Sequence, residues 1–162
     1  MSELRVNKIL PKEGKPSGAI GGGIVQVVRA QNTTQNQKPS ANTTWTDVSP
    51  SCTITPTSAS NLIIIESSAL NITRGHGYFA WRLLRGSTVI REWWGYNSNS
   101  SDYTPLQGPG KHIDSPATTS AVTYHYEIYA VSNSGYFMWN YQGPDGTNPY
   151  RQAELYCMEL SA

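Results

Sequence analysis

Residues 121–132 read AVTYHYEIYAVS, and their side chains alternate between two faces with a period of two. One face is aromatic and aliphatic, and it carries Tyr124, Tyr126, Ile128 and Ala130. The other face is mixed, and it carries His125, Glu127, Tyr129 and Val131. Successive side chains of a β-strand point to opposite sides of its sheet, so this pattern predicts a strand with one buried face.

Most of the remaining chain gives the same signal, and no segment has the period of an amphipathic helix. Residues 77–94, GYFAWRLLRGSTVIREWW, predict a hairpin that turns at RGST, with Phe79, Trp81 and Leu83 on one face. Residues 135–141, GYFMWNY, are expected to pair with 122–131 across the turn at SNSG. Further strands are expected in the segments 24–30, 45–48, 52–54, 61–72 and 152–160.

These strands predict an all-β fold, because no helical segment is present to cross between parallel neighbours. About eight short strands with brief connections are typical of an antiparallel β-sandwich that is jelly-roll-like in topology. The polar segments 31–42 and 95–112 are expected to be loops. A chain of 162 residues suffices for one such domain and is too short for two of ordinary size.

The first 23 residues differ from the rest of the chain. MSELRVNKIL places Leu4, Val6 and Ile9 on one side of an extended segment, and PKEGKPSGAIGGG then interrupts regular structure. We expect residues 1–23 to form an extended N-terminal arm and residues 24–162 to form the sandwich body. A flexible hinge is expected at the glycines Gly18, Gly21, Gly22 and Gly23. An extended segment of about 18 residues spans up to roughly 60 Å, and it can add to a sheet edge or lie in a groove on a neighbouring protein.

The composition argues against several classes of partner. Charged residues make up 14% of the chain and the net charge is +1, which leaves no clustered basic surface for nucleic acid. No apolar run approaches the roughly 18 residues of a membrane span, and no secretory signal is evident at the N-terminus. Cys52 and Cys157 both fall in expected strands, where two buried free thiols are favoured over a disulfide.

No catalytic or metal-binding motif is evident. His76, His112 and His125 have no spacing that puts two of them on one face of a strand or helix, although a threefold assembly could gather three copies of one histidine. The glycines of GAIGGG precede a strand, whereas a dinucleotide site needs a following helix. A glycosidase would need two acids to meet in space, and the candidates are Glu66, Glu92, Asp102, Glu127 and Asp145. We therefore expect no enzymatic activity, no cofactor and no metal.

The aromatic residues favour types with a polar group, since five Trp and ten Tyr stand against two Phe. REWWGY, residues 91–96, places Trp93 and Trp94 on opposite faces of one strand, so one is expected in the core and the other outward. Packing in the core and between subunits is the leading interpretation of the aromatic residues. The alternative is a shallow surface that stacks on sugars or grips a protein, with candidate contacts at Trp94, Tyr96, Tyr103, Trp139 and Tyr141.

Several motifs occur in a characteristic order: SELRVNKILPKEG, GIVQVVRAQ, TTWTDVSPSCTITPTSAS, AWRLLRGSTVI and the closing RQAELYCMEL. Together they resemble small tail-fibre and related virion structural proteins of tailed bacteriophages, particularly aquatic phages. The likeness covers nearly the whole chain, and its motifs encode strands and turns rather than a reaction. The segments 95–111 and 142–150 depart from it, which leaves the receptor specificity open.

The resemblance implies a homotrimer in the virion, made in the host cytoplasm, whose body projects toward a host glycan or protein. It implies that residues 1–18 bind another virion protein, such as a tail adaptor, nozzle or baseplate protein. It assigns the attachment to Leu4, Val6, Ile9 and Pro11. Two alternatives stay open: a capsid decoration or head-fibre protein that clamps capsid subunits, and a carbohydrate-binding module.

Overall fold

The computed structural model of the chain is all-β, and its described residues include no helix. It describes residues 23–32, 36–39, 44–68, 71–74, 77–98, 104–106, 110–132, 136–139 and 153–161. Apart from Gly23, the predicted arm lies outside these ranges. The assignments of Leu4, Val6, Ile9 and Pro11 to attachment, and of Gly18, Gly21 and Gly22 to a hinge, therefore stay predictions.

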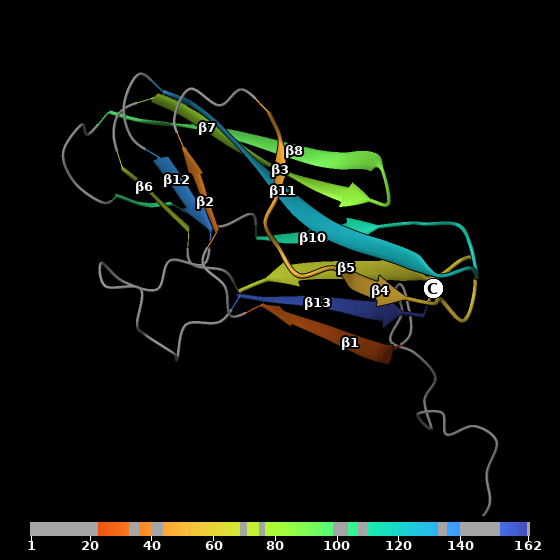
Figure 1. Cartoon of the computed structure of the whole chain (residues 1–162). Coiled ribbons are helices and arrows are strands. Elements are labelled where there is room, and N and C mark those ends of the chain that lie inside the picture. The colour runs from red at the N-terminus through yellow and green to blue at the C-terminus, as the bar shows by residue number, and fades with distance from the viewer. Residues whose placement is uncertain are drawn as a thin grey trace, which may run out of the picture.

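Thirteen antiparallel strands make up the part of the chain that the structure describes (Figure 1). In chain order they are β1 (Ile24–Asn32), β2 (Asn36–Pro39), β3 (Thr46–Asp47), β4 (Cys52–Ile54), β5 (Leu62–Ser67), β6 (Asn71–Arg74), β7 (Gly77–Arg85), β8 (Thr88–Asn97), β9 (Thr104–Leu106), β10 (Lys111–Asp114), β11 (Val122–Ser132), β12 (Tyr136–Trp139) and β13 (Ala153–Leu160). The first sheet has the order β1-β13-β5-β10, and the second has the order β3-β11-β7-β8, with β4 also paired to β11. A third sheet of short strands has the order β2-β12-β6-β9.

The first two sheets have the topology of a jelly roll. The first strand pairs with the last, β1 with β13, and inside this pair β3 and β4 pair with β11, β5 with β10, and β7 with β8. The chain therefore runs like one long hairpin that is folded into two facing sheets. Because β3 and β4 share one edge of β11, each sheet has four strand positions. The prediction of a jelly-roll-like antiparallel sandwich of about eight strands is confirmed.

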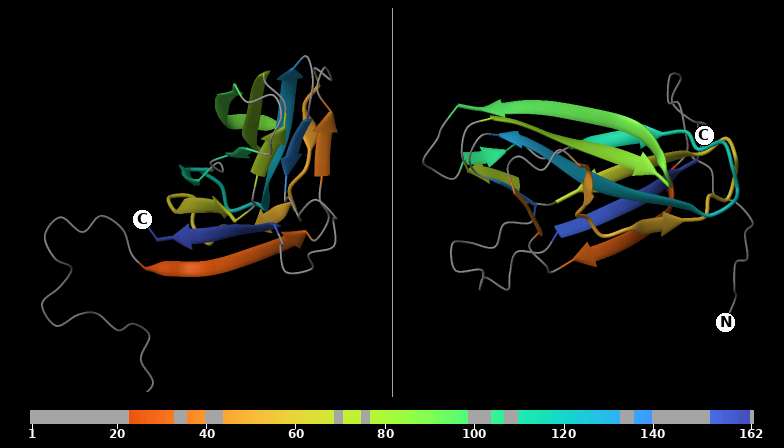
Figure 2. Two further views of the ribbon diagram at one scale, coloured as in Figure 1. Left: turned by 90° about the vertical axis from the view of Figure 1, so that its left-hand side faces the viewer. Right: turned by 45° about the horizontal axis from the view of Figure 1, so that its top comes forward.

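The two ends of this sandwich differ. The third-sheet strands β2, β6, β9 and β12 lie in the connections from β1 to β3, β5 to β7, β8 to β10 and β11 to β13, which all fall at one end (Figures 1 and 2). At the opposite end the chain enters β1 at Ile24, which pairs with Leu160. There the Ser161 amide donates to the Gly23 carbonyl over 3.3 Å. We call the end that carries the third sheet the distal end, and the end at which the chain enters β1 the entry end.

The third sheet is the part of the fold that the sequence predicts least well. The polar segments predicted to be loops contain β2 and β9, because strands of three or four residues show too little alternation to be recognised. The predicted hairpin between β11 and β12 is wrong, since β12 pairs with β2 and β6. The chain leaves the second sheet after β11 and enters the third.

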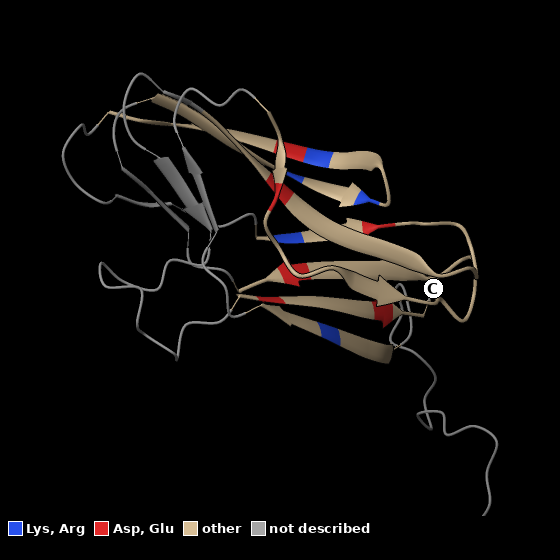
Figure 3. Ribbon diagram, in the orientation of Figure 1, with Lys and Arg blue, Asp and Glu red and all other residues tan. Residues whose placement is uncertain are grey.

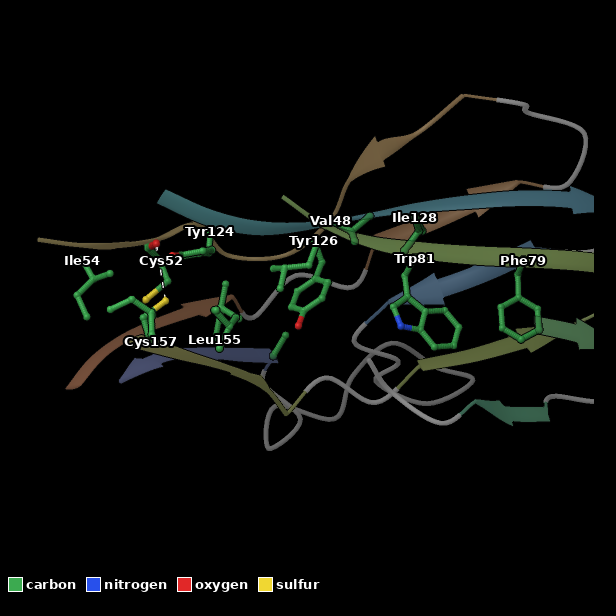
Figure 4. Close-up of a cluster of buried hydrophobic side chains, with 14 of the residues drawn as sticks. Val48, Cys52, Ile54, Phe79, Trp81, Tyr124, Tyr126, Ile128, Leu155 and Cys157 are labelled. Atoms are coloured by element: carbon green, nitrogen blue, oxygen red, sulfur yellow. Dashed lines mark hydrogen bonds between the residues drawn. The ribbon is translucent and has the colours of Figure 1, made fainter. Parts of the chain in front are cut away.

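The core lies between the first two sheets and has the alternation that the sequence predicts (Figure 4). Its members from the second sheet include Ile54, Phe79, Trp81, Leu83, Tyr124, Tyr126 and Ile128, and those from the first include Ile63, Ile65, Leu155 and Cys157. Gly95 of β8 lets the Phe79 ring lie against the backbone, because a Cβ at that position would come within 2.2 Å of the ring. The buried face of residues 121–132 is therefore the middle of the core.

Cys52 and Cys157 lie on the inner faces of different sheets, and both are buried free thiols, as the sequence predicts. Figure 4 shows their sulfur atoms side by side. The Cys157 thiol donates to the Cys52 carbonyl oxygen over 4.0 Å. A hydrogen bond with the Cys52 thiol, together with burial, raises the pKa of Cys157. The two thiols therefore pack between the sheets without forming a disulfide.

One carboxylate is buried at the entry end. Glu159 of β13 has no exposed surface, and its oxygens accept hydrogen bonds from Gln26 Nε2 at 2.5 Å, the Thr57 amide at 2.7 Å, Thr57 Oγ1 at 2.8 Å and Asn61 Nδ2 at 2.6 Å. Burial raises the pKa of Glu159, but these hydrogen bonds outweigh it and lower the pKa to about 2. The ionised side chain fastens the turn between β4 and β5 to β1.

Candidate functional site

The outer face of the second sheet carries a cluster of aromatic side chains. The register places Tyr129 of β11 beside Ala80 of β7, and Ala80 beside Trp94 of β8. Ala80 is fully buried although it faces outward, because the rings of Tyr129 and Trp94 meet above it with centroids 5.6 Å apart. Trp45, directly before β3, lies 5.2 Å from the Tyr129 ring and 6.4 Å from the Trp94 ring. We call Trp45, Trp94 and Tyr129 the aromatic cluster.

Charged side chains hold the cluster from the next row of the sheet. Arg82 lies in register with Glu127 on one side and with Glu92 on the other. Its guanidinium carbon is 4.3 Å from the centroid of the Trp45 ring, and it forms an ion pair with Glu127 at 2.6 Å. Glu92 accepts a hydrogen bond from Trp94 Nε1. The indole N–H of Trp94 is therefore tied to the sheet, and the Trp45 ring is held by the cation over its face.

A second aromatic pair lies on the same face, nearer the distal end. Tyr78 and Tyr96 are in register, and their ring centroids are 4.9 Å apart. Both rings are more than half exposed, and the neighbouring Trp94 is 55% exposed. Exposed rings that neighbours hold in place form a shallow surface on which a sugar ring or an apolar side chain can stack.

Two of the five contact residues that the sequence predicts, Trp94 and Tyr96, lie on this face. Tyr103 and Tyr141 lie outside the described residues. Trp139 lies in β12, of which the structure describes the backbone. The structure therefore brings Trp94 and Tyr96 together and leaves the other three as predictions.

The sequence prediction omits three aromatic residues of this face: Trp45, Tyr78 and Tyr129. Alternation already assigns Tyr78 and Tyr129 to the outer faces of their strands, so a signal for both exists in the sequence. Trp45 precedes a strand of two residues, and no period indicates its direction. Trp93 points inward, as predicted for one of the paired tryptophans, and its ring lies 6.4 Å from that of Trp81.

The titratable candidates from the sequence lie only partly in the part of the chain that the structure describes. Within it, no three His, Cys, Asp or Glu side chains are grouped so that they could hold a metal ion. Glu66 forms an ion pair with Lys111 at 3.2 Å. His76, Asp102 and Asp145 lie outside the described residues, whereas His112 lies in β10 and His125 in β11. The residues that the structure does describe include no helix long and apolar enough to cross a membrane.

The chain matches no protein-family model, and a search of curated proteins found no similar sequence.

Proposed function

We propose that this chain is a non-enzymatic structural protein of a tailed-bacteriophage virion, a trimeric tail fibre anchored by its N-terminal arm. Its body would contact the host surface. The motif resemblance supports the viral assignment. The observation that carries the proposed arrangement is the polarity of the sandwich, because the chain enters at one end and the sheet β2-β12-β6-β9 lies at the other. A body held at its entry end presents its distal end outward.

The aromatic face supports a contact role for the body. Tyr78 and Tyr96 lie toward the distal end, and Trp94 beside them leaves more than half of its surface open. Large rigid rings provide contact area at a low cost in conformational entropy, which is why Trp and Tyr are common at binding surfaces. The face is suited to a host glycan or to a protein of the host surface.

Charged substitutions in the arm test the anchoring. The variant Leu4→Asp with Val6→Asp should be missing from purified virions, because an apolar strip can no longer lie in a groove or along a sheet edge. The control variant Ser2→Asp with Asn7→Asp adds the same charge at polar positions and should be incorporated normally. Normal amounts of the Leu4→Asp, Val6→Asp protein in virions would show that this strip is not the anchor.

A capsid decoration or head-fibre protein is the nearest alternative, and it predicts a different phenotype. Particles that lack a decoration protein should lose stability and adsorb normally, whereas particles that lack a tail fibre should fail to adsorb. An image of the intact particle with this protein labelled shows directly whether it lies on the tail or on the capsid.

Carbohydrate binding is a separate alternative, and the exposed rings of Trp94 and Tyr96 favour it. Trp94→Ala with Tyr96→Ala should then abolish binding on a glycan array. Val89→Ala is the matched control, because it shortens another exposed apolar side chain of β8. No glycan signal from the wild type, together with normal adsorption of the double variant, would exclude sugar stacking on this face.

A further inference from the structure

The outer face of the first sheet is apolar over the half nearest the entry end. Strand pairing places Val27, Met158, Ile64 and Ile113 in one row that crosses all four strands. Val27 of β1 is 54% exposed and Ile113 of β10 is 57% exposed. The row therefore ends in an exposed apolar side chain at each edge of the sheet.

A second apolar row lies still closer to the entry end. Ile24, Leu160 and Leu62 are in register there, and Val25 lies beside them at a bulge in β1. Ile24 and Val25 are both exposed. We call the two rows the apolar half-face, which consists of Ile24, Val25, Val27, Leu62, Ile64, Ile113, Met158 and Leu160.

By register, the charged side chains of this outer face belong to Arg29, Glu154, Glu66 and Lys111, and all four lie in its other half. Figure 3 marks the charged positions along each strand. The row next to Val27 and Ile113 contains Arg29, Tyr156, Glu66 and Lys111. Arg29 forms an ion pair with Glu154, and Lys111 forms one with Glu66. Each cation is thus neutralised within its own subunit, so the charged half adds little repulsion when two copies approach.

The edge strand β1 makes this face prone to association. Its nine residues include one charged side chain, Arg29, and no lysine or proline. In the described part of the chain its second edge pairs with no other strand. Long edges with exposed apolar side chains associate with another chain unless something covers them.

We propose that a second copy of this chain covers the apolar half-face, which makes this face the subunit interface of the trimer proposed above. The row runs from β1 to β10, so each subunit offers two unlike edges. The Val27 edge of one copy can meet the Ile113 edge of the next. Contacts between unlike edges generate a closed ring when the rotation between subunits is suitable, as a trimer requires.

The point at which the chain enters the sandwich gives a second, independent reason for a copy as the occupant. Residues 1–22 precede Gly23, which lies at the entry end beside Ile24 of the half-face. Copies that associate through the half-face bring these segments to one place. Three arms that start together bind a repeated virion site with a higher effective concentration than three separate arms.

The mass of the full-length protein in solution tests the interface. Light scattering should give the mass of a trimer for the wild type and of one chain for Val27→Lys with Ile113→Lys. Because both positions are more than half exposed, the lysines can reach solvent, and the variant should keep the strand content and melting behaviour of a folded body. Val89→Lys, on β8 and also exposed, is the matched control and should stay trimeric.

Disulfide trapping tests the geometry of the same contact. A chain with Val27→Cys and Ile113→Cys should form intermolecular bonds between positions 27 and 113 when air and a copper catalyst oxidise it. Either single variant should stay unlinked, because unlike edges do not bring two copies of one position together. Cross-linking of the single variants would contradict the arrangement of unlike edges.

Two outcomes would overturn the proposal: a wild-type mass of one chain, or a trimer that the paired lysines leave intact. A monomeric wild type whose incorporation into virions is lost with the paired lysines would assign the half-face to another virion protein. A failed Leu4→Asp, Val6→Asp test would instead remove the anchoring function and leave the interface result unchanged.

Discussion

Glu159 gives a direct test of what holds the entry end together. One of its oxygens accepts from the Thr57 amide, the Thr57 hydroxyl and Asn61, and the other accepts from Gln26. In Glu159→Gln an amide NH₂ group replaces one carboxylate oxygen. This new donor must face at least one of the groups that donate to Glu159 in the wild type. An unpaired buried donor costs about 1–3 kcal/mol, which in a chain of this size lowers the melting temperature by roughly 2–12 °C.

The pH dependence separates the loss of charge from the change of shape. Although burial opposes the shift, the hydrogen bonds lower the pKa of Glu159 from 4.5 to about 2. A carboxyl whose pKa is depressed in the folded state stabilises the fold above its unfolded pKa, and this contribution is lost as the pH falls toward the folded pKa. The difference in unfolding free energy between the wild type and Glu159→Gln should therefore be largest at neutral pH and shrink between pH 4.5 and 2.

Urea unfolding followed by tryptophan fluorescence measures this difference at steps across that range. The other carboxylates titrate in both proteins, so their effects cancel in the difference. Glu66→Gln is the matched control, because its ion pair with Lys111 is exposed and should contribute less than about 1 kcal/mol. A difference for Glu159→Gln that stays constant from neutral pH to pH 2, or no difference at all, would refute the view that the ionised carboxylate fastens the turn.

Two further predictions concern the core. Gly95→Ala should destabilise the protein by about 1–3 kcal/mol, because its Cβ would come within 2.2 Å of the Phe79 ring. Urea unfolding measures the loss, and adding Phe79→Leu to Gly95→Ala should recover part of it. If the losses of the two substitutions simply add, the clash is contradicted. Cys52 and Cys157 should resist iodoacetamide in the native protein and react after denaturation, since both are buried. A hydrogen bond with Cys52, together with burial, also raises the pKa of Cys157. Mass spectrometry that finds either thiol labelled in the folded protein would show that the pair is accessible.

The alternation of side chains in the sequence predicts which face of each long strand is buried, because each of these strands has one face against the core and the other at the surface. In β11, Tyr126 and Ile128 are fully buried while Glu127 between them reaches Arg82 outside. The same signal is too weak in β2 and β9, which have four and three residues. Alternation also does not show which strands pair with each other. For this reason the sequence predicts a hairpin of β11 and β12 that the chain does not form.

The two candidate surfaces depend on strand order, which no local pattern encodes. Trp45 and Tyr129 become neighbours because β3 pairs with β11 in the second sheet. In the first sheet, alternation places Met158 on the outer side of β13. Its position in one row with Val27 and Ile113 follows only from the strand order β1-β13-β5-β10. Sequence reasoning therefore predicts which side chains point outward and does not predict which of them form one surface.

The positions of these surfaces make the two proposals compatible. The apolar half-face lies on the first sheet near the entry end, and Tyr78, Trp94 and Tyr96 lie on the outer face of the second sheet toward the distal end. A trimer formed through the first sheet leaves the second sheet of every subunit exposed. Three identical aromatic faces can then bind a repetitive host surface with an avidity that one face cannot reach. Val27→Lys with Ile113→Lys should consequently weaken adsorption even though it leaves each aromatic face unchanged.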